Sequence, residues 1–391
     1  MRLTSIQSVS RSALAMGLIL VLLATTYSLG GPNSISFDSR DRGGDFLKVL
    51  LWLPGPPPVS GLLEGLVSRF GILTVHYDEI GLFHLPPFSM LLALLTRQLF
   101  GVIGPGTVYL LFLALFLLTV AAVVFRATDD LKWVLVAMLS YPLICVVDRG
   151  NLFSGLCSIC ILLALLRPKA DWATAFLLAI AINLRPNTGL MAIPLLLIDW
   201  RLCRRLVLSS LILFVVGLAG SNQLFPDYTL EAFQGGLERY ARAYVLDGAG
   251  VQFGSSLYGA TFALGRPALL ASTVISLVPV PLALYAHSKG RLAFDELLFI
   301  CAAVTTLATA IFADYHLLIF LAPAILAKSR MVFWASVLML APKGLWMWGP
   351  FTAQVILNPL ILITACAVIL VGSLRAEDSS APRSAGAFNR K

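Results

Sequence analysis

The sequence predicts an all-α protein that crosses a membrane many times, and three observations carry this prediction. Of the 391 residues, 59% are hydrophobic and only 12% are charged, and the mean hydropathy is +0.89. Soluble domains are about 45–50% apolar. Apolar runs of about 17–25 residues, the length that crosses a bilayer as a helix, recur along almost the whole chain. We therefore exclude a soluble protein and expect one transmembrane domain over residues 1–375, followed by a disordered tail over 376–391.

The first apolar run, residues 13–30, follows Arg2 and Arg11, so its N-terminus should be cytoplasmic. A cleaved signal peptide is the competing interpretation, but no small-x-small site follows, which favours a retained helix. Residues 31–104 should form a large first outer loop with interfacial helices. Its last part, 85–101, is apolar but short, and Arg97 and Gln98 interrupt it.

The positive charges decide whether the 85–100 segment spans. If it lies at the outer surface, 17 of the 28 Lys and Arg residues are cytoplasmic, and if it spans, the number falls to 9. The positive-inside rule favours the first arrangement, with about twelve spans and both termini cytoplasmic. The spans are expected near 13–30, 105–125, 133–147, 152–166, 172–184, 188–200, 207–222, 268–287, 295–311, 316–327, 331–348 and 355–374.

The formal charge of +8 is then a topology signal and gives no reason to expect a nucleic-acid partner. A second large outer loop, 223–267, contains the amphipathic stretch LEAFQGGLERYARAY. That helix could be a solvated cap or a lid that faces the acceptor, and both readings stay open. Cys157 and Cys160 have CxxC spacing inside an apolar run, which indicates a packed helix rather than a metal or redox site.

Polar residues gather on the predicted outer side, whereas the cytoplasmic loops offer mostly isolated Lys and Arg. Ionisable groups at membrane depth are functional candidates because they are expensive to place there. The chemistry is therefore expected to face outward. The outer candidates are Asp38, Asp41, Asp45, His84, Asp148, Arg149, Asn151, Asn183, Arg185, Asn187, Ser255, Ser256, Asp314, Tyr315 and His316.

The order of several motifs resembles a known superfamily. The motifs are GGDF at 43–46, HLPPFSMLLALL at 84–95, DRGNLFSGLCSICILLALL at 148–166, AIAINLRPNTGLMAIPLLLIDWRLCRR at 179–205 and DYHLLIFLAPAIL at 314–326. This pattern is similar to that of the GT-C membrane glycosyltransferases, most of all family 87, the polyprenol-phosphate-mannose-dependent α-mannosyltransferases. The resemblance covers roughly residues 13–375, although the family often has Lys where this chain has Arg185.

The resemblance implies a GT-C-like bundle in the plasma (inner) membrane that transfers a sugar, mannose above all, from a polyprenyl-phosphate donor to a glycolipid or glycan acceptor, with inversion. Polyprenyl phosphate is a weakly basic leaving group, so one carboxylate acting as general base suffices. By its match to GGDF, Asp45 resembles that base; the alternative is that it caps a helix beginning at Phe46. Asp38 and Asp41 share their loop with Arg40 and Arg42, which favours a solvated ion cluster.

Seven further residues are expected to contact substrate. Arg185 suits the donor phosphate because a guanidinium binds phosphate through two donors, although a snorkelling Arg is the alternative. His316 could instead be a capping residue, and Asp148 could simply pair with Arg149. The seven are His84, Asp148, Asn151, Arg185, Asn187, Tyr315 and His316. No DxD motif is present, so we expect no metal and no cofactor.

Two rival classes share the membrane fold. A transporter or flippase of lipid-linked sugars would commonly show paired repeats with broken helices in both halves, and no such repeat is found in the sequence. A polymerase or ligase of lipid-linked sugars tends to place its catalytic Arg and His in one late loop, whereas the candidate carboxylates here come early.

Overall fold

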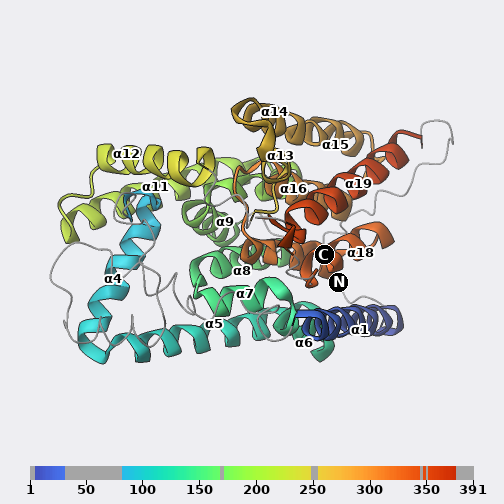
Figure 1. Ribbon diagram of the computed structural model, residues 1–391, viewed down its shortest axis with the longest axis horizontal. Coiled ribbons are helices and arrows are strands. Elements are labelled where there is room, and N and C mark those ends of the chain that lie inside the picture. The colour runs from blue at the N-terminus through green and yellow to red at the C-terminus, as the bar shows by residue number, and fades with distance from the viewer. Residues whose placement is uncertain are drawn as a thin grey trace.

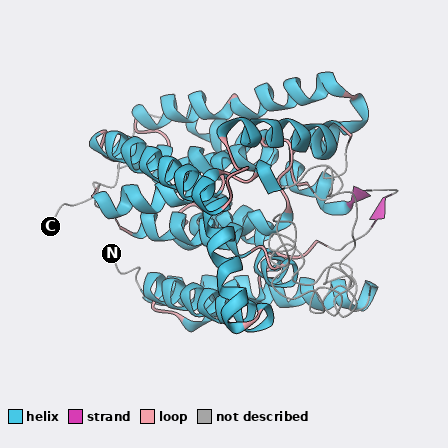
Figure 2. Cartoon of the chain, turned by 90° about the vertical axis from the view of Figure 1, so that its left-hand side faces the viewer, coloured by secondary structure: helices cyan, strands magenta, loops and turns pink. Residues whose placement is uncertain are grey.

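The structure is a computed structural model that describes residues 5–30, 82–167, 171–247, 254–343, 347–348 and 351–375. These residues are almost entirely helical, with one short antiparallel hairpin at the periphery, β1 (Met347–Trp348) and β2 (Phe351–Thr352), in which Met347 pairs with Thr352 (Figure 2). The expectation of an all-α protein is confirmed at this level. Residues 31–81 of the predicted first outer loop, which include the GGDF carboxylate, and the tail lie outside the described residues.

The elements follow one another closely along the chain (Figure 1). In order they are α1 (Ser5–Gly30), η3 (Leu82–His84), α4 (Pro87–Ile103), α5 (Pro105–Thr128), α6 (Leu131–Leu139), α7 (Tyr141–Arg149), α8 (Leu152–Leu166), α9 (Trp172–Leu184), η4 (Pro186–Ala192), α10 (Ile193–Ile198), α11 (Arg201–Leu224), α12 (Leu230–Tyr240), η5 (Ala241–Leu246), α13 (Leu257–Thr261), η7 (Phe262–Leu264), α14 (Arg266–Leu277), α15 (Pro279–Ser288), α16 (Phe294–Ala308), η8 (Asp314–Phe320), α17 (Leu321–Leu326), α18 (Arg330–Leu340) and α19 (Ala353–Arg375).

Among the described residues, four helical stretches are long and apolar enough to cross a membrane: Gly106–Thr128, Arg201–Leu224, Arg266–Ser288 and Gln354–Arg375. A fifth is the bent pair α6 and α7. Shorter apolar helices account for much of the remaining bundle, and α4 is one of them. In Figure 1, α4 meets α5 at a sharp corner at Gly104, whose φ of +80° favours glycine. The chain thus has the build of an α-helical membrane protein.

Helix α16 is the centre of the core. Every residue from Leu297 to Val304 is 0% exposed, which a helix achieves only when it is apolar on all sides and surrounded by others. It packs against α14, α15, α19 and η4. The outer helices instead expose apolar side chains, such as Leu118 of α5 at 67% and Leu270 of α14 at 71%. Exposed apolar surface of this extent is typical of a protein that faces lipid.

Helices α8, α9, α11 and α4 pack side by side in that order. The contact between α11 and α4 is close because α11 presents Gly217, whose hypothetical Cβ would lie 2.5 Å from the backbone nitrogen of Phe88. One turn further on, the Ser221 hydroxyl donates to the Pro87 carbonyl at 3.2 Å. Small residues at such a contact let two helix backbones approach, as in other membrane bundles.

Three connections gather at one end of the bundle. Arg11 of α1 donates to the carbonyls of Ala327 at 2.7 Å and Lys328 at 3.2 Å, beyond the end of α17. Ser12 donates to Asp130 at 2.5 Å, and Asp295 of α16 accepts from the backbone nitrogen of Lys328 at 2.6 Å. The span boundaries predicted from the sequence place all these positions at or near cytoplasmic ends. The structure brings them together at one end of the bundle.

Two predicted spans differ from the structure. The segment 133–147 is not one straight helix: it breaks at Ser140 and bends by 55°. Pro142 causes the break, because it lacks the N–H that would bond to Met138 and its ring clashes with that turn. The segment 331–348 is helical only to Leu340, since Ala341 is extended (ψ 146°) before Pro342. The spans predicted at 152–166 and 172–184 coincide with α8 and α9.

Candidate functional site

The first part of the site is the turn between α7 and α8. Gly150 ends α7 in a left-handed conformation (φ +70°), and Asn151 then begins α8 as its N-cap. The Asn151 side-chain oxygen accepts from the backbone nitrogen of Ser154 at 3.3 Å and from the Ser154 hydroxyl at 2.6 Å. Asn is a favoured N-cap because its oxygen satisfies the free N–H groups of the first turn. The cap fixes both side chains in one orientation.

Arg185 joins this turn from α9. It ends α9 in an extended conformation (φ −145°, ψ 92°) because Pro186 follows. Its Nε donates to the Ser154 hydroxyl at 3.1 Å and its Nη2 to the Asn151 oxygen at 3.3 Å. A guanidinium has five N–H donors in a planar fork. These two bonds therefore hold the fork in place and leave further donors for a ligand.

His316 lies on η8 within electrostatic reach of Arg185. Its ring packs against Tyr315, with centroids 4.4 Å apart, and against Phe312 at 5.0 Å. Part of the residue reaches the surface, but both ring nitrogens are enclosed and neither has a hydrogen-bond partner. An enclosed imidazole without a partner is costly and calls for an explanation. A ligand beside Arg185 would supply the missing partner.

Asn187 lies two residues after Arg185 and contacts the end of α16. Its amide nitrogen donates to the hydroxyl of Thr309 at 3.3 Å, just beyond the end of α16. Both residues line a hollow of about 380 Å³ between η4 and α16, together with Pro186, Gly189, Leu190, Leu277, Thr305 and Ala308. Pro186, the residue that follows Arg185 in the chain, is part of its lining. The hollow is the size of a small ligand site.

The structure groups His84 with α12 rather than with α8 and α9. The His84 ring stacks on Tyr240 with centroids 4.7 Å apart, and Tyr240 stacks on Tyr244 at 4.8 Å. Nearby, the hydroxyl of Tyr228 donates to the Leu85 carbonyl at 2.6 Å, and burial raises the pKa of this phenol. The start of α4 is therefore held by the predicted second outer loop.

Of the remaining predicted residues, Asp148 lies near the α7–α8 turn, and the three carboxylates of the first outer loop lie outside the described residues. Asp148, at the end of α7, has its Oδ2 enclosed and interacts electrostatically with Tyr109, whose hydroxyl donates to the Val147 carbonyl at 2.9 Å. Asp148 therefore sits beside the turn that carries Asn151. The predicted base Asp45, with Asp38 and Asp41, lies outside the described residues.

The sequence analysis named Asp314 and Ser255 as outer polar residues but missed the polar cluster that surrounds Asp314, which is 3% exposed. The Ser255 hydroxyl donates to its Oδ1 at 3.1 Å and the Tyr141 hydroxyl to its Oδ2 at 3.4 Å. With its amide nitrogen turned towards the carboxylate, Gln354 donates to both oxygens, at 3.2 and 2.9 Å. Lys343 interacts electrostatically with the same carboxylate. Four separate segments thus meet at one buried carboxylate, two residues before His316.

A sequence signal for this cluster existed. Gln354 lies one helical turn before Asn358 at the start of an otherwise apolar helix, and Asn358 donates to the Ser255 hydroxyl at 2.8 Å. Amides at that spacing share one helix face, which predicts a polar partner for the face. Tyr141 gave no comparable signal, since its partner lies 173 residues away in the chain.

Within the described ranges, no group of three or more His, Cys, Asp or Glu side chains is placed to hold a metal ion. Cys157 and Cys160 lie buried in α8, and the Cys157 thiol contacts the Ala181 carbonyl at 3.5 Å.

Comparisons of the chain with protein-family models, curated proteins and solved structures give no match.

Proposed function

We propose that the chain is a GT-C-like glycosyltransferase that moves a sugar, mannose above all, from a polyprenyl-phosphate donor to a glycolipid or glycan acceptor. The observation that carries the proposal is the enclosed, partnerless imidazole of His316 within electrostatic reach of the braced guanidinium of Arg185. The order of motifs described above supports the same class of enzyme.

Arg185 is proposed to hold the donor phosphate. Ser154 and Asn151 take two of its N–H donors and orient the guanidinium plane. The other donors would bind phosphate oxygens, and such charge-assisted bonds are about twice as strong as neutral ones. The charge on the phosphate increases as the glycosidic bond breaks, so a fixed cation favours the transition state over the ground state.

His316 is proposed to bind the donor sugar or its phosphate through one ring nitrogen. The ring is held edge-on by Tyr315 and tilted against Phe312, so its nitrogens keep one direction. Asn187 and the hollow that it lines with Thr309 are proposed to take the next part of the sugar, because amides and hydroxyls suit sugar hydroxyls.

The proposed reaction is a single displacement with inversion. The acceptor hydroxyl oxygen attacks the anomeric carbon, the bond from that carbon to the phosphate oxygen breaks, and the electron pair leaves with polyprenyl phosphate. A carboxylate takes the acceptor proton, and Asp45 is proposed for this role by its match to GGDF. No acid is required, because the phosphate is a weak base.

The finer architecture is part of the same proposal. It comprises about twelve spans in the plasma (inner) membrane, cytoplasmic termini, and a site that opens outward between the two large outer loops. The helix α4, which meets the candidate span α5 at a sharp corner, is proposed to lie at the outer surface.

The test is transfer from radiolabelled polyprenyl-phosphate mannose, with glucose and galactose donors as controls, in membranes that contain the full chain. His316→Phe keeps the aromatic packing and removes both nitrogens, so we expect donor kcat/KM to fall at least tenfold with an unchanged Tm. Wild-type transfer by His316→Phe would contradict the role of His316, and no transfer from any donor by the wild-type chain would contradict the enzyme.

A further inference from the structure

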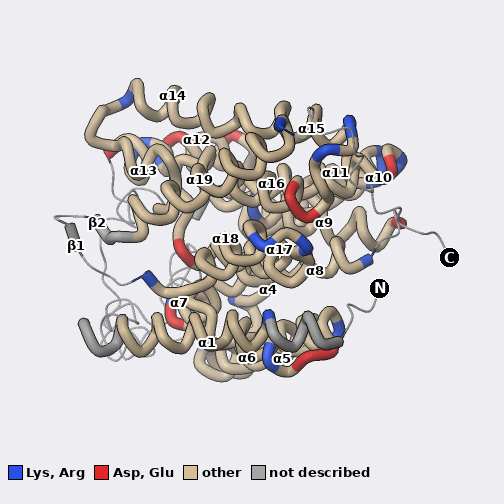
Figure 3. The backbone as a smooth tube through the Cα atoms, turned by 90° about the vertical axis from the view of Figure 1, so that its right-hand side faces the viewer, with Lys and Arg blue, Asp and Glu red and all other residues tan. Residues whose placement is uncertain are grey.

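A surface with exposed Arg and Trp side chains lies at the corner between α10 and α11, where Figure 3 shows Lys and Arg gathered. Trp200 immediately precedes α11 and is 77% exposed. Two Arg side chains near the start of α11, Arg201 and Arg204, are also exposed. We call Trp172, Trp200, Arg201, Arg204 and Arg205 the α11 corner.

The start of α9 completes this corner. Trp172, the first residue of α9, is 54% exposed, and the guanidinium of Arg205 lies over its ring at 5.8 Å from the centroid. A cation at this distance from an indole face is attracted to it. The two helices pack along their lengths, so the contact is built into the bundle rather than made by a single loop.

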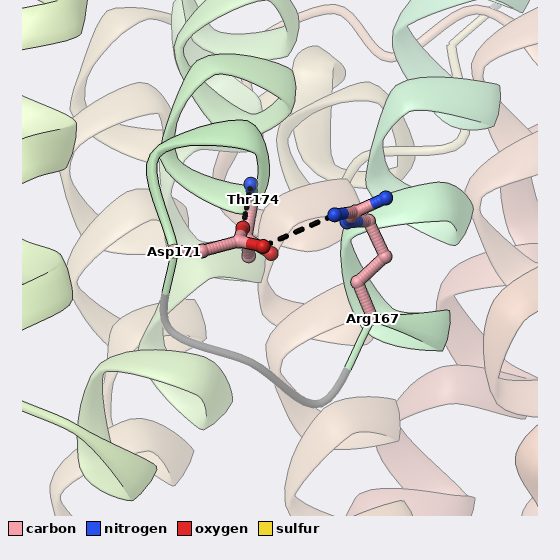
Figure 4. Close-up of polar contacts among 3 residues, drawn as sticks. All are labelled: Arg167, Asp171 and Thr174. Carbon is pink, nitrogen blue, oxygen red and sulfur yellow. Dashed lines mark hydrogen bonds and ion pairs between the residues drawn. The ribbon is translucent and has the colours of Figure 1, made fainter.

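The two neighbouring carboxylates are already engaged. Asp171 accepts from the Thr174 backbone nitrogen at 2.8 Å and pairs with Arg167 at 3.0 Å (Figure 4). Asp199 accepts from the Arg201 backbone nitrogen at 2.9 Å. Within the part of the chain that the structure describes, the guanidinium groups of Arg201 and Arg204 form no ion pair. Even when the negative charge of Asp199 is counted, Arg201, Arg204 and Arg205 leave the α11 corner with a net positive charge.

The position of this positive charge relative to a membrane indicates which kind of molecule it binds. Residues 201–224 are one of the helical stretches long enough to cross a membrane, so its first turn lies at a membrane–water boundary. Exposed Trp side chains are typical of that boundary, and Arg there attracts anionic lipid. We propose that the α11 corner binds the headgroup of an anionic glycerophospholipid, with the phosphate between Arg201 and Arg204 and the acyl chains beside Trp200.

This proposal does not depend on the glycosyltransferase proposal, and its test needs no activity. The full chain is placed in nanodiscs of phosphatidylcholine with increasing phosphatidylglycerol, and bound lipid is followed by Tm and by native mass spectrometry. Removing one interfacial cation weakens anionic-lipid binding about fivefold. Arg201→Gln/Arg204→Gln should therefore bind phosphatidylglycerol roughly 30-fold more weakly, whereas Arg201→Lys/Arg204→Lys should keep most of the affinity.

The matched control is Arg239→Gln/Arg242→Gln, which removes two exposed Arg residues from α12 and η5 and should change the affinity less than twofold. Equal loss in both double variants would overturn the site, because the effect would then be one of net charge. Unchanged binding in Arg201→Gln/Arg204→Gln would overturn it too. Tighter binding of polyprenyl phosphate or inorganic phosphate than of phosphatidylglycerol would overturn the assignment to a glycerophospholipid.

Discussion

Replacing Arg185 by alanine should separate its role as a ligand from its role as a brace. The variant loses the bonds to Ser154 at 3.1 Å and Asn151 at 3.3 Å, and each bond from a charged donor contributes about 1.5–3 kcal/mol at most. Both acceptors keep another partner, since the Ser154 hydroxyl still donates to Asn151 at 2.6 Å. We therefore expect a moderate fall in Tm and a folded protein.

The effect on transfer should be larger. If Arg185 makes one charge-assisted bond to the donor phosphate, its loss lowers donor kcat/KM roughly 10- to 150-fold, the equivalent of about 1.5–3 kcal/mol. Arg185→Lys restores the charge without the planar fork and should recover part of the rate. Ser154→Ala keeps the charge and loosens one brace, so it should lower the rate less than Arg185→Ala.

The assay is donor-dependent transfer of radiolabelled sugar, with Tm measured on the same preparations. Arg266→Ala, which removes an exposed Arg from the start of α14, controls for loss of net charge. If Arg185→Ala transfers sugar at the wild-type kcat/KM while its Tm falls, Arg185 is only a brace between α8 and α9, and the phosphate site must be sought elsewhere.

Three further outcomes are expected. Asp45→Asn should lower kcat by about 10²–10⁴ while Asp41→Asn lowers it far less, as read by transfer assays at saturating donor; the reverse order would move the general base to Asp41. Gly217→Ala should lower the free energy of unfolding by about 1–3 kcal/mol, because the new Cβ meets the backbone of Phe88, which no rotamer change can relieve; an unchanged Tm would contradict the close contact. The Thr174 backbone bond and Arg167 lower the pKa of Asp171 to about 2. The carboxylate therefore contributes to folding stability above pH 4, by about 1 kcal/mol or less because the side chain is 36% exposed, and this contribution is lost as the pH falls towards 2. Asp171→Ala should show a smaller loss of Tm than the wild type between pH 4 and pH 2, and parallel curves would refute the lowered pKa.

Local features of the fold could be predicted from the sequence because local chemistry fixes them. The start of α8 follows from Gly150 and the Asn151 cap, and the end of α9 follows from Pro186. The break at Ser140 could also have been found, since Pro142 lies inside the predicted span, but an uninterrupted apolar run concealed it. Hydropathy reports what a segment contacts and not whether it is straight.

The site was predictable only in part, for a different reason. Arg185 and Asn151 were singled out because each interrupts an apolar pattern, and the structure joins them at 3.3 Å. The cluster at Asp314 depends instead on segments far apart in the chain, such as Tyr141 and Gln354. No periodicity within one helix encodes a contact of that kind. It results from how the helices pack around α16.

The bend between α6 and α7 makes the two halves of one helical stretch run in different directions through the bundle. A straight helix over Leu131–Arg149 would be roughly 28 Å long, about the thickness of the hydrocarbon core. Turning α7 by 55° displaces its far end by about 11 Å from the line of α6, and α7 packs against η8. Pro142 thus sets where Asp148 and Arg149 come to rest, and relocating this proline by one turn would re-aim both charges without altering either.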